Sequence, residues 1–244
     1  MNNRTHDEVW ESLGAEDADW AVASTPGMKH GRWSSQLQEF YDTGRARVDE
    51  ALALLPELRF HRALDWGSGT GRLSFALAER FENVTCVDIS TTMLTTLRER
   101  AGERGITNLE PRHLDDFKPS SDHDFALCLI TLQHFPDRQS VAAALAAMVG
   151  SLRPGGVLLA EIPVRPLTLK YRVQPRLQAY RALRKLGVSP SRLHRFGLSG
   201  ISMLCVPQSW TEEVVREAGA EMLRTLARRG TSHEQVYYVA RRRQ

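Results

Sequence analysis

The residues whose types and spacing suggest chemistry lie between Asp65 and Gly71, which read Asp-Trp-Gly-Ser-Gly-Thr-Gly. Glycine at every second position lets a ligand pass close to the backbone, because no side chain blocks its path. Such turns between a first strand and a helix commonly bind nucleotides. A dinucleotide fingerprint would need its third glycine where Arg72 stands, and the Gly-Lys-Ser/Thr ending of a phosphate loop is absent. The pattern therefore predicts a nucleotide-type ligand other than NAD.

The elements that must position this turn alternate between short apolar strands and helices. Strands are expected at 63–66, 84–88, 109–114, 125–129 and 157–162. Helices are expected after the turn as far as 80, at 91–104 with Ser90 as N-cap, and at 140–152. A helix at 209–218 and strands at 220–227 and 235–241 complete the chain. This order predicts an α/β fold: a doubly wound, Rossmann-like, seven-stranded, mostly parallel sheet with an antiparallel terminal strand, plus helical N-terminal and insert caps.

Four further motifs follow the glycine turn in a fixed order. They are Asp88 at the end of the second strand, Leu114-Asp115-Asp116-Phe117, the segment 124–134 around the fourth strand, and Leu152-Arg153-Pro154-Gly155-Gly156. With the turn, they span residues 63–162 and resemble the class I S-adenosylmethionine-dependent methyltransferases of small-molecule type. The ordered set is a more specific indication than the turn alone.

The resemblance implies S-adenosylmethionine as cofactor. The residues that it assigns to cofactor binding are Asp65, Trp66, Gly67, Ser68, Gly69, Gly71, Asp88, Ile89, Met93, Asp115, Asp116, Phe117 and Leu129. Asp88 can accept two ribose hydroxyl hydrogen bonds, whereas Asp65 can face the ligand's ammonium group or hold the loop through backbone amides. Asp115 is favoured for the adenine amino group and the backbone of Asp116 or Phe117 for a ring nitrogen. A solvated acidic pair at 115–116 is the alternative.

Methyl transfer from a sulfonium is an in-line displacement that needs alignment, desolvation and a deprotonated acceptor. His134, near the end of the fourth strand, is the candidate catalytic base because imidazole titrates near neutral pH. The alternative for His134 is a ring packed beside the cofactor, and Asp137 is the second candidate base. No metal is expected, because the carboxylates are scattered and no His-Glu-x-x-His pattern occurs.

Two segments outside the motifs are expected to cover the site and select the acceptor. In the first, Tyr41 is a candidate substrate-binding residue and joins Trp10, Trp20, Trp33 and Phe40 as an apolar lid, with ordinary helix packing as the alternative. The second lies in the stretch from Ile162 to Thr211, which contains nine Lys and Arg residues and no Asp or Glu. Arg181 and Arg184 there are candidates for binding an acidic acceptor. A solvated basic face and an RNA or lipid surface are the alternatives.

Composition limits the classes of protein. A chain of 244 residues, 42% hydrophobic and 25% charged, suits one domain. Its parts are an N-terminal helical cap (1–57), a cofactor-binding core (58–164), a basic cap insert (165–208) and a C-terminal return to the sheet (209–244). No apolar stretch approaches the roughly 20 residues of a membrane span, and no signal region opens the chain. Three cysteines, expected as core fillers, are too few for a disulfide framework, so a cytoplasmic protein is predicted.

The predicted function is S-adenosylmethionine-dependent methyl transfer to oxygen or nitrogen, with carbon less favoured, of a small specialised metabolite that can be anionic. An RNA methyltransferase, suggested by the basic insert, and a cofactor-binding protein without methyl transfer are the alternatives. The expected partner is a small-molecule acceptor and not a nucleic acid. The sequence does not predict the oligomeric state.

Overall fold

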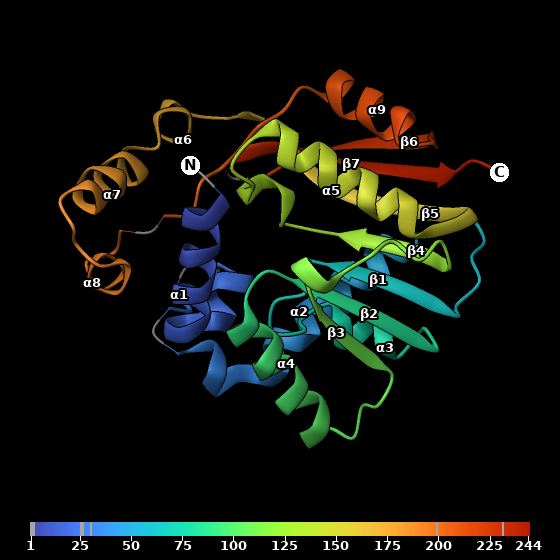
Figure 1. Ribbon diagram of the computed structural model, residues 1–244, viewed down its shortest axis with the longest axis horizontal. Helices are drawn as coiled ribbons and strands as arrows, with labels where there is room; N and C mark the ends of the chain where they lie inside the picture. The colour runs from blue at the N-terminus through green and yellow to red at the C-terminus, as the bar shows by residue number, and fades with distance from the viewer. Residues whose placement is uncertain (1–2, 25–26, 30, 199, 231) are drawn as a thin grey trace.

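The computed structural model describes residues 3–24, 27–29, 31–198, 200–230 and 232–244. Its centre is a seven-stranded sheet in the order β3-β2-β1-β4-β5-β7-β6 (Figure 1). The strands are β1 (Arg62–Trp66), β2 (Asn83–Asp88), β3 (Leu109–His113), β4 (His123–Cys128), β5 (Leu152–Pro166), β6 (Ala220–Arg229) and β7 (His233–Arg242). Neighbours among β1 to β5 pair in parallel, and β7 is antiparallel to both β5 and β6. The predicted fold class is confirmed.

Helices cover both faces of this sheet and extend beyond one end of it (Figure 1). They are α1 (Asn3–Val22), α2 (Leu37–Leu52), α3 (Ser74–Ala78), α4 (Thr91–Glu103), α5 (Arg138–Ser151), α6 (Leu169–Val173), α7 (Pro175–Lys185), α8 (Pro190–Arg195) and α9 (Gln208–Glu217). Leu145 of α5 and Val215 of α9 are buried in one core cluster. Val48 of α2, Leu77 of α3 and Leu97 of α4 are buried in a second cluster that also holds strand residues. The sheet therefore separates two apolar cores, as a doubly wound fold requires.

Side-chain caps set the starts of two helices. Ser90 Oγ accepts a hydrogen bond from Met93 N at 3.2 Å, so α4 begins directly after the predicted N-cap. Asp137 Oδ1 accepts from Ser140 N at 2.8 Å, and α5 begins at Arg138, two residues before the predicted start. Asp137 is thus an exposed helix cap, which corrects its interpretation as a second candidate base.

Several strands extend beyond their predicted bounds, β5 by the most, and the N-terminal segment is helical over most of its length. β5 extends to Pro166 because β7 pairs with it as far as the Pro166–His233 register position. In the N-terminal segment, α1 consists of two helical parts that meet at a kink at Asp17, where the dihedral angles are non-helical (φ −160°, ψ 64°). This helix buries Val9 and Leu13 against Met93 and against the basic insert. Both differences arise from tertiary partners that lie far away in the sequence.

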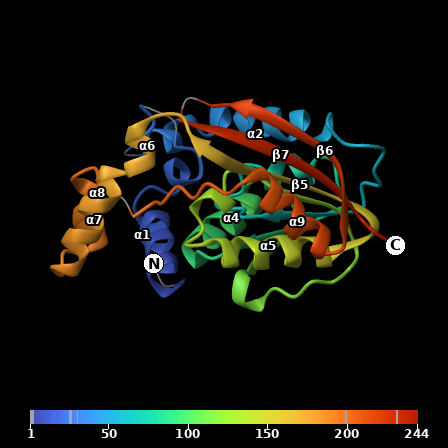
Figure 2. The same ribbon diagram turned by 90° about the horizontal axis from the view of Figure 1, so that it is seen from above.

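The basic insert forms an arm, by which we mean residues 167–198 with α6, α7 and α8. The arm stands at one end of the molecule, beyond α1 (Figures 1 and 2). Tyr180 of α7 and Leu193 of α8 are buried on the side that faces α1. Within the described ranges, no helix is long and apolar enough to cross a membrane.

The three cysteines are free thiols. Cys86 of β2 and Cys128 of β4 are buried in the two cores, as expected, whereas Cys205 is only half-buried. Burial raises the pKa of each thiol, so none of them is activated as a nucleophile.

Candidate functional site

The glycine turn lies between the carboxyl ends of β1 and β2. The amides of Gly67 and Ser68 donate to Val87 O at 2.8 and 3.0 Å, which fixes the turn against β2. Gly67 and Gly69 have φ values of +81° and +54°, a conformation that side chains disfavour. A Cβ atom at Gly67 would lie 2.2 Å from Thr131 Oγ1, so this position requires glycine. The turn therefore presents backbone without side chains at the carboxyl ends of the strands, where the sequence predicts the ligand site.

Asp88 is held on both sides of its carboxylate. Oδ2 accepts a hydrogen bond from Gly69 N at 2.8 Å, and Oδ1 accepts from Ser90 N at 2.9 Å. Burial raises the pKa of Asp88, and these two amides oppose that shift. Each oxygen keeps a lone pair for a further donor. The carboxylate thus links the turn to α4 and can still accept hydrogen bonds from a ligand.

Asp65 lies behind the turn with one oxygen unpaired. Oδ2 accepts from Ser74 Oγ at 2.6 Å, whereas Oδ1 is buried and has no hydrogen-bond partner in the part of the chain that the structure describes. Burial raises the pKa of Asp65 to about 6. Ser68 Oγ is buried and without a partner in the same part of the chain. Unsatisfied buried polar atoms are costly, so a ligand with polar and cationic groups fits this end of the turn.

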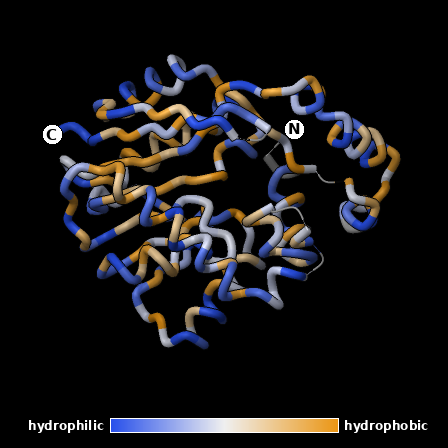
Figure 3. Tube along the Cα trace, turned by 180° about the vertical axis from the view of Figure 1, so that it is seen from behind, coloured by the Kyte–Doolittle hydropathy of each residue, from blue (hydrophilic) through white to orange (hydrophobic). Residues whose placement is uncertain are grey.

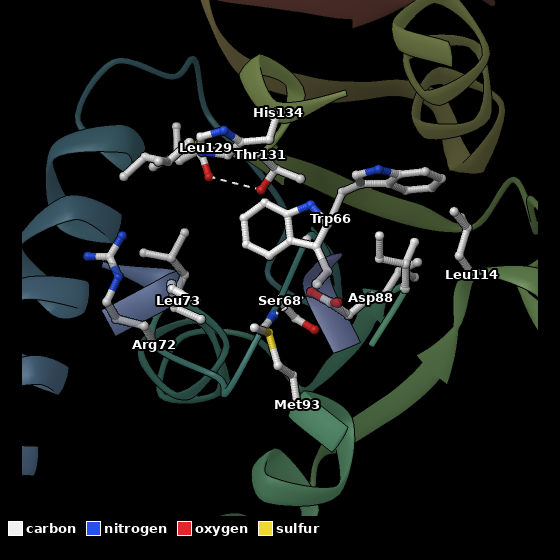
Figure 4. A pocket seen from close by; sticks show the side chains of 18 of the residues that line it. Trp66, Ser68, Arg72, Leu73, Asp88, Met93, Leu114, Leu129, Thr131 and His134 are labelled. Atoms are coloured by element: carbon white, nitrogen blue, oxygen red, sulfur yellow. Dashed lines mark hydrogen bonds between the residues drawn. The ribbon is translucent and has the colours of Figure 1, made fainter. Parts of the chain in front are cut away.

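A pocket of about 760 Å³, including its mouth, adjoins the turn (Figure 4). Arg72 and Leu73 lie on the side opposite Leu114, and Met93 lies opposite His134. The predicted cofactor residues that line the pocket are Trp66, Gly67, Ser68, Gly69, Asp88, Ile89, Met93 and Leu129. A largely apolar lining with a few polar groups suits a small organic ligand.

Two predicted cofactor residues support the pocket from outside. Gly71 has a φ of +93°, which side chains disfavour, and a Cβ atom there would lie in tight contact, 3.2 Å from Leu97 Cγ of α4. Phe117 packs edge-on against Trp66, with ring centroids 5.5 Å apart. Both residues therefore position the wall of the pocket without lining it.

The acidic pair at 115–116 is exposed to solvent. The Asp115 side chain is 88% accessible, and its Oδ2 lies 3.5 Å from His113 Nδ1. Neither Asp115 nor Asp116 lines the pocket, whereas the preceding Leu114 does. The solvated alternative therefore describes these side chains better than a direct contact with adenine does.

Tyr41 is buried away from the pocket. The centroid of the Tyr41 ring lies 4.9 Å from that of Phe75, and the Arg104 guanidinium lies 3.9 Å from the centroid of the same Tyr41 ring. Tyr41 does not line the pocket, because α1 and not α2 closes this side. We therefore drop Tyr41 as a substrate residue, and the helix-packing alternative describes it.

Helix α1 supplies wall residues that the sequence analysis missed or only partly foresaw. His6, Trp10, Ala21 and Val22 line the pocket. Trp10 was a lid candidate, but His6 was not singled out, although its position four residues before Trp10 places both on one helix face. Asp19 anchors the helix, since Oδ1 and Oδ2 accept from Arg100 Nη1 and Nη2 at 2.7 and 2.9 Å. The arrangement makes α1 a cover for the pocket.

Arg72 is a second residue that the sequence analysis did not assign to the site. It lines the pocket, is 5% exposed, and its Nε has no partner among the described residues. Burial lowers the pKa of its guanidinium to about 10. A buried cation with a free donor can bind an anionic group of a ligand.

His134 uses both ring nitrogens inside the protein. Nδ1 lies 2.9 Å from Ser202 O, to which it donates, and Nε2 lies 3.0 Å from Gln133 Nε2, from which it accepts. Burial lowers the pKa of His134 to about 4, so the ring is neutral at physiological pH. His134 lines the pocket as predicted, but this bonding favours the packed ring over the catalytic base.

His134 should make stability depend on pH. Because its pKa in the fold lies near 4, below the ordinary value of 6.5, the unfolded chain binds the proton first as the pH falls. The stabilising contribution of the neutral ring is therefore complete above pH 6.5 and is lost progressively towards pH 4. We expect the wild type to lose up to about 2 kcal/mol more than His134→Asn between pH 6.5 and 5, measured by urea unfolding. Equal losses would assign the pH dependence to other histidines with lowered pKa values, such as His6 or His123.

A second hollow of about 470 Å³ shares Phe135 with the first pocket. Arg172 and Arg181 line it, and neither forms an ion pair within the described chain. Arg184 lies elsewhere: Nη1 donates to Val188 O at 3.0 Å, and Nη2 is 3.7 Å from Glu8 Oε2. Of the two predicted acceptor-binding arginines, Arg181 thus lines this hollow, whereas Arg184 does not line it and ties the arm to α1.

Within the described residues, no group of three or more His, Cys, Asp and Glu side chains could hold a metal ion. The polar side chains that line the pocket, among them Ser68, Arg72 and Asp88, instead suit an organic ligand with hydroxyl and charged groups, whereas Asp65 lies behind the turn and does not line the pocket.

Known proteins are similar to this chain in sequence or in fold. The chain is 33% identical over 130 residues to a trans-aconitate 2-methyltransferase of Deinococcus radiodurans, covering 52% of this chain and 48% of that protein. It is 30% identical over 155 residues to a ubiquinone biosynthesis O-methyltransferase of Pseudomonas aeruginosa, covering 59% and 63%. A magnesium protoporphyrin IX methyltransferase of Synechocystis with bound S-adenosylhomocysteine superposes with a TM-score of 0.63 at 20% identity, covering 99% of this chain and 100% of that one. The chain spans about half the length of the first curated relative.

Fold and site together define a cofactor-binding domain of Rossmann-like type. The family model described as "Methyltransferase domain" matches residues 63–156. Residues 63–156 therefore resemble the S-adenosylmethionine-dependent methyltransferases, as the motifs predict, and this resemblance supports S-adenosylmethionine as the cofactor.

Proposed function

We propose that this protein transfers the methyl group of S-adenosylmethionine to an oxygen or nitrogen atom of a small acceptor. One observation carries the proposal: a single pocket joins the glycine turn and Asp88 to an aromatic wall from α1. When bound, the cofactor supplies an electrophilic methyl group on a positively charged sulfur. The cofactor side of the pocket, formed by the glycine turn and Asp88, and the acceptor side, formed by the aromatic residues of α1, thus belong to the same pocket.

The residues on the cofactor side have separate roles in this proposal. Asp88 accepts hydrogen bonds from the ribose hydroxyls with the lone pairs that Gly69 N and Ser90 N leave free. Ser68 gains a partner for its unpaired hydroxyl from the amino-acid end of the cofactor, and Arg72 binds its carboxylate. Asp65 does not line the pocket and supports the turn from behind through its hydrogen bond with Ser74. Ile89 and Leu114 provide apolar contact for the adenine ring.

The acceptor side excludes water and aligns the nucleophile. The His6 ring lies 6.3 Å from Trp10 and 6.0 Å from Phe135, and Trp10 lies 5.3 Å from His134, between centroids. Such a wall fixes a flat acceptor by contact with its faces and edges. Because both ring nitrogens of His134 are hydrogen-bonded within the protein, we propose that His134 positions this wall. The acceptor then reacts through a lone pair on its own oxygen or nitrogen atom, which is either deprotonated or neutral.

The second hollow supports the proposal that the acceptor carries an acidic group. Phe135 borders both cavities, so an acceptor in the first pocket can extend past it to Arg172 and Arg181. Cations without acid partners favour a carboxylate or phosphate at that place. Trans-aconitate, in the name of one relative, is itself a carboxylate.

The test offers small phenols and amines in pairs, as free carboxylic acids and as methyl esters, and measures release of S-adenosylhomocysteine. We expect turnover, with a lower KM for the acids. Arg181→Gln should raise the KM of the acids by about 3- to 10-fold and leave the esters unchanged, the loss expected for one exposed charged contact. Arg184→Gln is the matched control and should change neither.

Equal KM values for acids and esters in wild type and Arg181→Gln would contradict the acidic acceptor. Cofactor binding without release from any acceptor would favour a binding protein, and release with RNA alone would favour the RNA alternative.

The four segments that the sequence predicts, 1–57, 58–164, 165–208 and 209–244, support this proposal, because α1 of the first segment closes the pocket of the second and the arm of the third packs against α1. We also propose a cytoplasmic location, which the three free thiols support.

A further inference from the structure

The arm carries an unbalanced set of charges. Between Ile162 and Thr211 there is no acid, and in the described chain only Arg165 and Arg184 of the nine cations form ion pairs, with Glu234 and Glu8. The remaining seven cations are Lys170, Arg172, Arg176, Arg181, Lys185, Arg192 and Arg195. Unpaired like charges on one structural unit create a positive field that favours anionic partners.

The same arm exposes large apolar side chains. Of the six exposed large hydrophobic residues in the described chain, four lie on the arm: Leu169 (72% exposed), Val173 (51%), Leu186 (79%) and Phe196 (82%). The other two are Phe60 (46%) and Leu223 (37%). Figure 3 shows hydrophobic and hydrophilic residues interspersed along the arm, at the right of that view. Exposed apolar groups concentrated in one unit indicate an interaction surface.

These exposed residues are additional to the apolar side chains that the arm already buries. The arm already buries Leu177, Tyr180 and Leu193, the last two of which pack with residues of α1. Leu186 and Phe196 directly follow the last residues of α7 and α8, and both side chains are exposed. Beyond its contact with α1, the arm extends away from the sheet (Figures 1 and 2). Its outer side is therefore available to a partner.

We propose that the arm binds peripherally to an anionic membrane surface. The cations that lie outside the second hollow meet the lipid phosphates; they are Lys170, Arg176, Lys185, Arg192 and Arg195. Leu169, Val173, Leu186 and Phe196 enter the boundary between headgroups and acyl chains. Basic helices with exposed Leu and Phe are suited to this interface, and helices of 5, 11 and 6 residues lie on it without crossing it. RNA fits less well, because three of the four apolar side chains are aliphatic and offer no ring for stacking on bases.

The experiment measures co-sedimentation of the full chain with phosphatidylcholine vesicles, with and without phosphatidylglycerol. We expect at least roughly tenfold tighter binding to the anionic vesicles. Leu186→Ser with Phe196→Ser should weaken that binding about tenfold without changing the charge. Phe60→Ser with Leu223→Ser is the matched control, which removes the two exposed hydrophobic residues outside the arm and should bind as the wild type does. Arg192→Gln with Arg195→Gln should reduce the preference for anionic lipid. All these positions are exposed, and thermal melting checks each fold.

Three results would overturn the proposal. One is equal binding to neutral and anionic vesicles. Another is binding that the serine pair leaves unchanged while a single-stranded RNA oligomer competes for it with steep salt dependence, which would assign the arm to RNA. The third is a dimer in sedimentation equilibrium that the serine pair dissociates, which would assign the apolar residues to contact between two copies. None of these outcomes depends on methyl transfer, so the proposed function is tested separately.

Discussion

Replacing Gly69 by leucine is expected to abolish binding of S-adenosylmethionine. Gly69 has a φ of +54°, and a Cβ atom there would lie 2.4 Å from Val22 Cγ2 of α1. A leucine side chain would therefore force α1 from the turn or enter the pocket, and either change removes the close path over the backbone. We expect a loss of more than about 100-fold in calorimetric affinity, equivalent to at least about 3 kcal/mol.

Gly105→Leu is the matched control for this change. Gly105 also has a positive φ, of +66°, but a Cβ atom there would meet nothing within 4 Å. Both variants should carry similar backbone strain, seen as a lower Tm, and only Gly69→Leu should lose the cofactor. Adding Val22→Ala to Gly69→Leu should not restore binding if the side chain blocks the ligand itself. Unchanged affinity in Gly69→Leu would show that the cofactor does not cross this turn.

The parts of the fold that the sequence predicts well depend on neighbours in the chain. The strands around Leu64 and Val87 are short apolar runs, and the cap at Ser90 acts on an amide three residues away. Gly67 and Gly69 need glycine for reasons of local backbone conformation. In each case, the controlling interaction is close enough in sequence for its residue types and spacing to reveal it.

The parts that the sequence did not predict depend on contacts between distant segments. His6 joins the pocket because its Nε2 lies 3.0 Å from His134 O, 128 residues away. Tyr41 faces Phe75 instead of the pocket, although its helical spacing alone is equally compatible with either direction. Arg181 and Arg184 differ by only three positions, yet one lines a hollow and the other meets Glu8. Composition marks such residues as candidates, and only the packing of α1 and the arm separates them.

Asp88→Ala is expected to weaken binding of S-adenosylhomocysteine by roughly 30- to 150-fold. The variant removes a pair of charged hydrogen bonds to the ribose, worth about 2–3 kcal/mol. It also leaves Gly69 N and Ser90 N without their carboxylate acceptor. Asp88→Asn keeps the shape and one neutral acceptor, so its loss should be smaller. Asp115→Ala is the control: its side chain is 88% exposed and outside the pocket, and we expect a change of less than about threefold.

A ligand without ribose hydroxyls separates the two consequences of Asp88→Ala. An S-adenosylhomocysteine analogue that lacks both hydroxyls should bind the wild type about as weakly as the normal ligand binds the variant, because the same hydrogen bonds are missing. It should lose little further affinity in Asp88→Ala if the turn keeps its place. A further large loss would mean that the carboxylate acts mainly by holding Gly69 and Ser90. Normal binding of S-adenosylhomocysteine by Asp88→Ala, together with weak binding by Asp115→Ala, would instead move the ribose site to the end of β3, because no direct contact with Asp88 would then remain to explain affinity.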